Sequence, residues 1–334
     1  MLKYTLKRLL MAIPVVWGIV TIVFVLMRVF SANPAYLMLG QRATAERVAE
    51  LTAYLGLDKP ILTQYGIFLK QLFQGDWGTS LFSGQPVMTE LLGRMPATIE
   101  LALFAVFIAS IIGIVLGVIC AVKQNSPLDR VCQVAGLAGI SLPRFWLGLM
   151  LIISFAVNMG ILPVSGRFDF MNQPEHVTGF MILDSIITGN WKALGSTLKY
   201  LTLPGITIAI SSVGTIMRYT RSTMLETIRQ DYIRTARAKG LRNNKVIFKH
   251  ALKNSMGPVI TYAGPMMAYI LTGSMVVENI FSVPGLGRLF VNSMLRTDYM
   301  MIMGVTIFLA LIMVLMNFIA DVLYKVMDPR INLS

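Results

Sequence analysis

Six long apolar stretches run through this chain of 334 residues, and they constrain its fold more than any other feature. A helix that crosses a membrane needs about 20 mainly apolar residues, with a range of about 17–25. Each of the six stretches reaches that length, so we expect an all-α membrane protein with six transmembrane helices. The predicted spans are Leu9–Phe30, Thr98–Val122, Val131–Asn158, Tyr200–Met217, Pro258–Ile280 and Met301–Tyr324.

The composition agrees with a membrane protein and argues against a soluble one. Hydrophobic residues make up 55% of the chain and charged residues only 13%, whereas soluble domains carry about 25% charge. The net charge of +13 would suggest nucleic acid in a soluble protein. Here the basic residues flank apolar runs, where orientation in the lipid bilayer accounts for them, so we expect no nucleic-acid partner.

The two cysteines predict neither a disulfide nor a metal site. Cys120 and Cys132 fall at the predicted ends of neighbouring spans, beside a short turn that we expect in the cytoplasm. A reducing compartment favours free thiols. Two cysteines without nearby histidines make no metal site, so we predict none.

Lys and Arg residues next to the spans predict the orientation of the chain. They gather in the N-terminal tail, the Lys123–Arg130 turn, the loop between Arg218 and Lys253, and the C-terminal tail. Because basic residues near spans favour the cytoplasmic side, both termini should be cytoplasmic. The first apolar run is longer than the 7–15 residues of a signal-peptide core, so we expect it to remain as a span.

We expect three parts along the chain. Residues 1–30 form the N-terminal tail and the first span, residues 31–97 form an extracytoplasmic segment with short helices, and residues 98–334 form a core with five spans and a cytoplasmic loop at 218–257. In the 31–97 segment, apolar spacing predicts helices over Thr44–Leu55 and Ile61–Phe73. These helices should lie on the outer membrane surface and bury Tyr65, Phe68, Leu72 and Trp77.

The loop between Arg218 and Lys253 carries ten of the 29 basic residues. Strong helix formers predict a helix over Glu226–Lys239, and Gly240 can take the left-handed geometry that ends a helix. Asn243 or Asn244 should cap a second helix that begins near Lys245. The loop therefore predicts a helix, a sharp turn and a second helix, which could fit a groove of another protein; the alternative is a solvated loop that only sets orientation.

This loop resembles the cytoplasmic loop of ATP-binding-cassette (ABC) importer permeases, whose signature is Glu-Ala-Ala, three residues and Gly. Aligned on Gly240, the chain has Arg234-Thr235-Ala236 in place of Glu-Ala-Ala. The stretch Asp231–Leu241, followed by His250-Ala251-Leu252-Lys253-Asn254 and Pro258, is similar to the version in the peptide and nickel branch of the family.

Three further stretches extend the resemblance over almost the whole chain. They are Gly75-Asp76-Trp77-Gly78-Thr79-Ser80 with Met95–Leu101, Leu162-Pro163-Val164-Ser165-Gly166-Arg167, and Glu278–Gly287. Together they look like the first permease subunit of a dipeptide or oligopeptide importer. The resemblance implies a type I ABC importer permease (MetI-like) architecture in the cell membrane of a bacterium or archaeon.

The resemblance also implies partners: a second, similar permease subunit, two cytoplasmic ABC ATPase subunits and an extracytoplasmic substrate-binding protein. No Gly-x-x-x-x-Gly-Lys-Ser/Thr loop occurs in the chain, so ATP and Mg²⁺ should be bound by the ATPases and the chain itself should be neither an enzyme nor a cofactor protein. In the family, the short loop helix docks into a cleft of the ATPase. Carried over, the coupling residues would be Asp231, Tyr232, Arg234, Thr235, Ala236, Ala238, Lys239, Gly240 and Leu241.

Three charged residues are candidates for the translocation path. Arg144 falls near the middle of the third predicted span, where an unpaired charge would cost at least about 2.5–3.5 kcal/mol. It either lines the path or binds helix carbonyls after Pro143 breaks the helix. Glu100 and Glu278, at outer ends of spans, either contact substrate or cap and pair, and we favour the structural interpretation for both.

Other classes of function are less favoured. Nickel or another small solute is the alternative cargo for an importer. An ion-coupled secondary transporter would need polar relays at mid-membrane and an inverted repeat, and neither is evident in the spans. An intramembrane enzyme would need a nucleophile with its base or a metal-ligand cluster, and we find none in the sequence.

Overall fold

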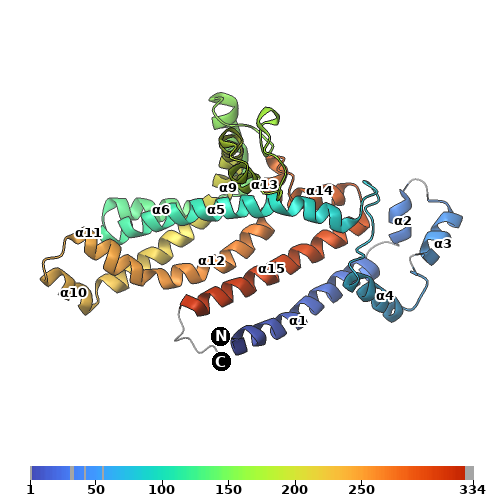
Figure 1. Ribbon diagram of the computed structural model, residues 1–334, viewed down its shortest axis with the longest axis horizontal. Helices are drawn as coiled ribbons and strands as arrows, with labels where there is room; N and C mark the ends of the chain where they lie inside the picture. Colours follow the sequence, from blue (N-terminus) through green and yellow to red (C-terminus); the bar gives the residue numbers. More distant parts are fainter. Residues whose placement is uncertain (1, 31–33, 41–42, 55, 328–334) are drawn as a thin grey trace.

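The computed structural model describes residues 2–30, 34–40, 43–54 and 56–327, and these residues fold into helices and connecting turns (Figure 1). Within the described ranges no strand is present; the one β-type contact is an isolated bridge between Thr79 and Pro86. The expected all-α fold is therefore confirmed.

Each predicted apolar stretch lies in helical structure. Four helices are long and apolar enough to cross a membrane, and two bent helix pairs raise the number to 6 if each pair is one span. The single helices extend several residues beyond most of the predicted limits because polar residues at their ends continue the helix. They are α1 (Leu2–Val25, continued by a π-helical turn at Leu26–Phe30), α5 (Val87–Val122), α9 (Trp191–Ile228) and α15 (Tyr299–Met327).

The third predicted span is broken. It consists of α6 (Pro127–Ser141) and α7 (Arg144–Leu151), which continues as a π-helical turn over Ile152–Asn158, and the two halves are bent by 105°. The break has a local cause: proline disfavours helical backbone in the residue before it, and Leu142, which precedes Pro143, is extended with φ −70° and ψ 130°. A single continuous span over Val131–Asn158 is therefore wrong in geometry, although both halves are helical.

The fifth predicted span also belongs to a bent pair. After α11 (Asn243–Lys245) and a π-helical turn (Val246–Leu252) come α12 (Lys253–Gly273) and α13 (Met275–Ile280). The two halves of this pair are Asn243–Tyr262 and Pro265–Ile280, and the angle between them is 42°. A proline inside a helix removes a backbone hydrogen bond, which accounts for the bend.

Short helices fill the 31–97 segment: α2 (Pro34–Leu39), α3 (Ala45–Tyr54) and α4 (Ile61–Phe73). The predicted helix over Ile61–Phe73 is confirmed, and the other prediction agrees within one residue, with Leu55 outside the described residues. Phe68 is buried and stacks on Phe24 of α1 at 5.3 Å between ring centroids. The apolar face of α4 thus packs on α1.

The main core surrounds α5 and α9, and glycines let the neighbouring helices approach closely. A Cβ added to Gly214 of α9 would lie 2.4 Å from the carbonyl oxygen of Gly136 in α6, and one added to Gly117 of α5 would lie 2.5 Å from Cβ of Thr220. The backbones of α6 and α9 therefore meet directly at Gly136 and Gly214, and α5 lies against the side chain of Thr220 at Gly117. This close packing joins the three helices into one unit.

Figure 1 shows α10 and α11 at one end of the bundle and α2, α3 and α4 at the other. The helix α1 begins, and α15 ends, toward the side of α10. The residues between α7 and α9 project sideways; they include a 3₁₀ turn (Phe170–Asn172) and α8 (Met181–Ile187). The helix α14 (Leu286–Leu295) precedes α15.

Candidate functional site

The short helix α10 (Asp231–Ala238) is the centre of the candidate coupling site. The preceding helix α9 ends at Ile228, and Gln230 is extended with φ −71° and ψ 149°. The predicted continuous helix over Glu226–Lys239 is therefore wrong: the chain turns before Asp231. An acidic residue in the first turn favours a new helix start, because it faces the positive end of the helix dipole.

One face of α10 is packed on the rest of the chain. Ile233 is 0% exposed and Ala236 is 8% exposed. Burying an isoleucine side chain stabilises by about 1.5–3 kcal/mol, so this face fixes the helix in place. The surrounding residues come from α5, α9 and the segment after α11: Val118, Ala121, Met224, Val246, Ile247 and Ala251.

Gly240 ends α10 in the predicted manner. Its φ is +73°, the left-handed conformation that favours glycine. The N–H of Gly240 donates to the carbonyl of Arg237 at 2.9 Å, and the N–H of Leu241 donates to the carbonyl of Ala236 at 3.4 Å. This pair of bonds is the Schellman helix end.

The predicted start of the second helix is wrong. The helix begins at Asn243 rather than near Lys245, Arg242 occupies the N-cap position, and no side chain caps it. Neither Asn243 nor Asn244 therefore acts as the cap, because both lie inside α11.

The other face of α10 is free of the bundle. The proposed coupling residues are exposed except Ala236, which is buried, and Leu241, which is half-buried. Tyr232 is 45% exposed and accepts a hydrogen bond from Asn254 at 3.3 Å. The exposed members of the predicted set are Asp231, Tyr232, Arg234, Thr235, Ala238, Lys239 and Gly240.

An ion pair fastens α9 to α6 about two turns before α9 ends. The guanidinium of Arg221 donates two hydrogen bonds of 2.8 Å to the two carboxylate oxygens of Asp129. Asp129 is 1% exposed and also accepts from the N–H of Asn125 and the amide of Gln133. Paired parallel bonds of this kind fix direction as well as distance, so the α9 end that leads into α10 is held against α6.

Arg144 sits directly after the break in the third span. Its guanidinium donates to the carbonyl of Gly273, at the end of α12, at 2.9 Å. It also lies over the ring of Tyr269, 4.8 Å from the centroid. A cation at a helix C-terminus is favourable, so the contacts agree with the structural interpretation; a role in the path stays a prediction.

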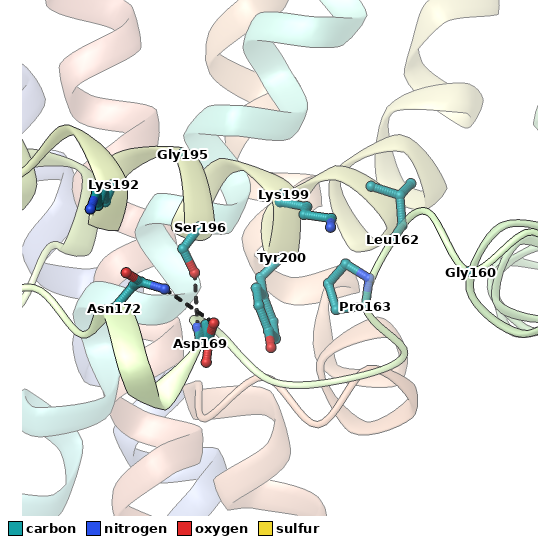
Figure 2. A pocket seen from close by; sticks show the side chains of 10 residues that line it. All are labelled: Gly160, Leu162, Pro163, Asp169, Asn172, Lys192, Gly195, Ser196, Lys199 and Tyr200. Atoms are coloured by element: carbon teal, nitrogen blue, oxygen red, sulfur yellow. Dashed lines mark hydrogen bonds between the residues drawn. The ribbon is translucent and has the colours of Figure 1, made fainter.

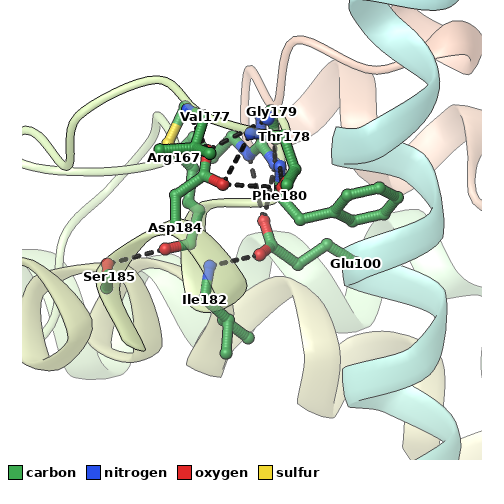
Figure 3. Close-up of polar contacts among 10 residues, drawn as sticks. Glu100, Arg167, Val177, Thr178, Gly179, Phe180, Ile182, Asp184 and Ser185 are labelled. Atoms are coloured by element: carbon green, nitrogen blue, oxygen red, sulfur yellow. Dashed lines mark hydrogen bonds and ion pairs between the residues drawn. The ribbon is translucent and has the colours of Figure 1, made fainter. Parts of the chain in front are cut away.

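Glu100 anchors the projecting segment to α5. Figure 3 shows its carboxylate between the guanidinium of Arg167 and the backbone of Ile182. Arg167 donates to Oε2 at 2.7 and 3.2 Å, and the Ile182 N–H donates to Oε1 at 2.6 Å. Both side chains are almost fully buried, at 7% and 3% exposed. These contacts make Glu100 a structural residue here, and its contact with substrate stays a prediction.

A second carboxylate, Asp184, organises the same segment (Figure 3). It is 0% exposed and accepts hydrogen bonds from the hydroxyl and N–H of Thr178 and from the N–H groups of Val177 and Gly179. Burial alone would raise the pKa of Asp184, but these hydrogen bonds hold the pKa below its ordinary value. The charged form is therefore the one that the fold selects.

Glu278 caps a helix rather than facing open space. It is 0% exposed, and its carboxylate accepts from Ser274 at 2.8 Å and from the N–H of Gly287 at 2.8 Å, in the first turn of α14. Gly285 leaves room for it, because a Cβ there would lie 2.4 Å from the carboxylate. The three predicted path residues, Arg144, Glu100 and Glu278, are thus each held by separate partners.

A cavity of about 460 Å³ opens beside the start of α9 (Figure 2). Lys192 and Lys199 stand on either side of Ser196, whose hydroxyl accepts from the N–H of Asp169 at 2.9 Å. The sequence analysis did not predict it. The available signal was the spacing of Lys192, Ser196 and Lys199, which places them on one helical face. The cavity presents cations next to a carboxylate.

Sequence reasoning also missed the partners of the buried charges: Arg167, Asp184, Asp129 and Arg221. A charged residue next to an apolar run signals that it needs a partner. The sequence does not indicate which residue that partner is. Among the described residues no group of His, Cys, Asp and Glu side chains could hold a metal ion.

Comparisons with known proteins agree with this architecture. Residues 113–333 match the family described as the binding-protein-dependent transport system inner membrane component, and residues 1–102 match its N-terminal family. The methionine ABC transporter MetNI contains a chain that superposes with a TM-score of 0.52 at 16% identity, covering 72% of this chain and 97% of that one. This likeness supports the type I importer fold.

Full-length relatives are also found. The chain is 41% identical to the dipeptide transport system permease protein DppB of Alkalihalophilus pseudofirmus, over 99% of this chain and 100% of the relative. It is 39% identical to the di/tripeptide permease DppB of Pseudomonas aeruginosa, over 99% of both, and 39% identical to the oligopeptide permease AppB of Bacillus subtilis, over 99% and 100%. The resemblance drawn from the sequence is confirmed. The chain belongs to the family of binding-protein-dependent transport inner membrane components, and it is a multi-pass membrane permease of the ABC class.

Proposed function

We propose that this chain is the first of two permease subunits in an ATP-driven importer of dipeptides or oligopeptides, and that it forms half of the translocation path. The relatives support this cargo, because each of the three is named for dipeptides, tripeptides or oligopeptides rather than for nickel. In this proposal a second permease, two cytoplasmic ATPases and an extracytoplasmic binding protein complete the importer. ATP and Mg²⁺ bind to the ATPases.

The observation that carries the coupling role is the two-sided nature of α10. Its inner face is buried on α5, α9 and the segment after α11, while Tyr232, Thr235 and Ala238 are exposed. A helix fixed on one side and open on the other can pass the movement of an ATPase cleft to the long helices. Arg234, Arg237 and Lys239 surround the open face with positive charge, which suits an acidic cleft rim.

The proposed path of the movement follows the packing. Movement of α10 reaches α9, which the Arg221–Asp129 pair and the glycine contacts hold to α6 and α5. It also reaches α12, which bends at Pro265. Alternating access then follows from the closing and opening of the partner ATPases. The closed and open ATPases contact α10 differently, so each favours a different conformation of the permease. In this orientation residues 31–97 face the binding protein, and both termini are cytoplasmic.

The test is ATP hydrolysis by the assembled importer in lipid nanodiscs, stimulated by its peptide-loaded binding protein. Ala238→Glu places a carboxylate on the open face without disturbing the core, and should lower the stimulated rate about tenfold, equivalent to about 1.4 kcal/mol of lost contact. Ala236→Glu is a poor test because Ala236 is buried and the variant would disturb folding.

Gln124→Glu is the matched control, since it adds the same charge to an exposed turn outside α10. Normal assembly and normal stimulation in Ala238→Glu would overturn the coupling role. Cargo is tested separately by uptake into proteoliposomes: we expect uptake of a labelled dipeptide, and uptake of Ni²⁺ without dipeptide would overturn the peptide assignment.

A further inference from the structure

Arg28 stands at the end of the first span, in the wall of a cavity of about 660 Å³. Its lining residues come from the end of α1, from α4 and from the beginning of α15. Figure 1 shows these three elements near one another. Phe68 and Leu72 of α4 and Met303 and Ile307 of α15 give it apolar walls. The cavity therefore has a polar end at Arg28 and an apolar remainder.

The guanidinium of Arg28 lacks the acceptors that the other interior arginines have. Its Nε and Nη1 atoms are buried and, among the residues that the structure describes, have no hydrogen-bond partner. Arg167 and Arg221, by contrast, each bind a carboxylate. The guanidinium of Arg28 lies over the ring of Tyr299, whose centroid is 5.7 Å from Cζ of Arg28. Buried donors without acceptors are costly, so this site favours an anionic ligand.

The remaining polar groups of the cavity carry a second cation. Lys59 lines it together with the amide of Gln71. One carboxylate, Asp76, also lines it and accepts from the N–H of Gly78 at 3.1 Å. Two cations against one carboxylate leave a net positive site, and a guanidinium matches the geometry of phosphate oxygens.

We propose that this cavity binds an anionic phospholipid, with the phosphate on Arg28 and Lys59 and an acyl chain along the apolar wall of α4 and α15. The position supports a lipid over a soluble anion. Arg28 lies in the last turn of the helical stretch that continues α1 to Phe30, and this stretch is long and apolar enough to cross a membrane. The end of such a stretch reaches the headgroup layer, and Phe68, Leu72, Met303 and Ile307 give the cavity apolar walls. The bound lipid would join α4 to the first and last spans.

Native mass spectrometry of the assembled importer tests the proposal, after delipidation and addition of phosphatidylglycerol, phosphatidylcholine or inorganic phosphate. The wild type should retain about tenfold more phosphatidylglycerol than Arg28→Gln. The reason is that losing a hydrogen bond to a charged group lowers affinity by about tenfold or more. Arg28→Lys should retain an intermediate amount. Arg94→Gln is the matched control, because Arg94 does not line this cavity and its half-buried side chain pairs with Glu90 at 3.7 Å.

Lys59→Gln keeps the proposal testable if Arg28→Gln fails to assemble, because Lys59 is exposed at the rim. It should lower retention of phosphatidylglycerol about threefold, a smaller loss than that of a buried donor. Equal retention of phosphatidylglycerol in the wild type and both variants would overturn the proposal. Equal loss in Arg94→Gln, or binding of inorganic phosphate without any lipid, would also overturn it.

Discussion

Among the described residues, two arginine–carboxylate pairs join segments that are far apart in the sequence, and they join different kinds of structure. Arg221 and Asp129 connect two long helices, α9 and α6, which also touch through the backbone at Gly214. Arg167 and Glu100 connect an irregular projecting segment to α5. The chemistry is the same, but the first pair adds to a packed helix contact, whereas the second holds a segment that has little regular structure of its own.

Because the two ion pairs have different surroundings, losing one partner should cost a different free energy in each. Removing one partner of a buried ion pair leaves an uncompensated charge, and the cost depends on what else can satisfy it. Asp129 keeps two other donors, Asn125 and Gln133. Among the described residues, the donor that remains for Glu100 is the N–H of Ile182. The projecting segment should therefore depend more on its pair than the helix contact does.

Arg167→Met should have the largest effect. It leaves Glu100 buried with one remaining donor, and we expect a loss of about 3–5 kcal/mol in the free energy of opening of residues 160–190. Hydrogen exchange of that segment measures the loss. The double variant with Glu100→Leu should recover part of it, because both charges are then removed. Unchanged hydrogen exchange in Arg167→Met would show that the projecting segment does not depend on its ion pair.

Arg221→Met should cost less, about 2 kcal/mol in the free energy of unfolding, because Asp129 keeps its other hydrogen bonds and Arg221 is 20% exposed. Thermal unfolding in detergent measures it, with a double-mutant cycle through Asp129→Asn to isolate the pair. If Arg221→Met loses as much free energy as Arg167→Met, the packing of α9 on α6 does not compensate for the lost ion pair.

Acid should weaken the projecting segment before it weakens the helix contact at Gly214. The pKa of Asp184 is lowered in the folded state, so its contribution is complete above the pKa of the unfolded chain and is lost as pH falls through the folded value. Each unit of lowering corresponds to about 1.4 kcal/mol. Hydrogen exchange of residues 176–190 across acid pH tests this, and Asp184→Asn should reduce the pH dependence of the opening free energy. Identical pH profiles in the wild type and the variant would contradict the prediction.

Gly240→Ala should have the smallest effect, about 1 kcal/mol, confined to the end of α10. The left-handed φ of +73° is strained for alanine, although no atom lies within 4 Å of the added Cβ. Gly257→Ala is the control, because Gly257 lies inside α12 with similar open space and without a positive φ. Hydrogen exchange of residues 231–241 should rise in the first variant alone, and no rise would contradict the role of Gly240.

Parts of the fold were predictable because their causes are local. The apolar stretches, the helix over Ile61–Phe73 and the helix end at Gly240 follow from runs, spacing and backbone preference. The break before Pro143 also has a local cause, but the apolar run continues on both sides of it, so hydrophobicity alone predicts one continuous span there. The bend of 105° goes with tertiary packing, in which α6 and α7 both lie against α9 and α7 also lies against α13, and no local pattern states this.

The partners of the charged residues could not be predicted in the same way. Glu100 binds Arg167 across 67 positions of sequence, and Arg221 binds Asp129 across 92. The buried face of α10 was likewise hidden: Ala236 was predicted to meet a partner, but it packs inward because Ile233 is on the same face. Eight residues of helix are too few for a pattern to decide which face meets the bundle.

The sequence by itself determined that the chain lies in a membrane as several helices, that a helix in the basic loop ends at Gly240, and that the chain resembles ABC importer permeases. These features depend on hydrophobic runs and on the conformational freedom of single residues. Only the tertiary structure decided which charges pair, which face of α10 is open and where Arg28 stays without an acceptor, because these depend on distant segments meeting in space.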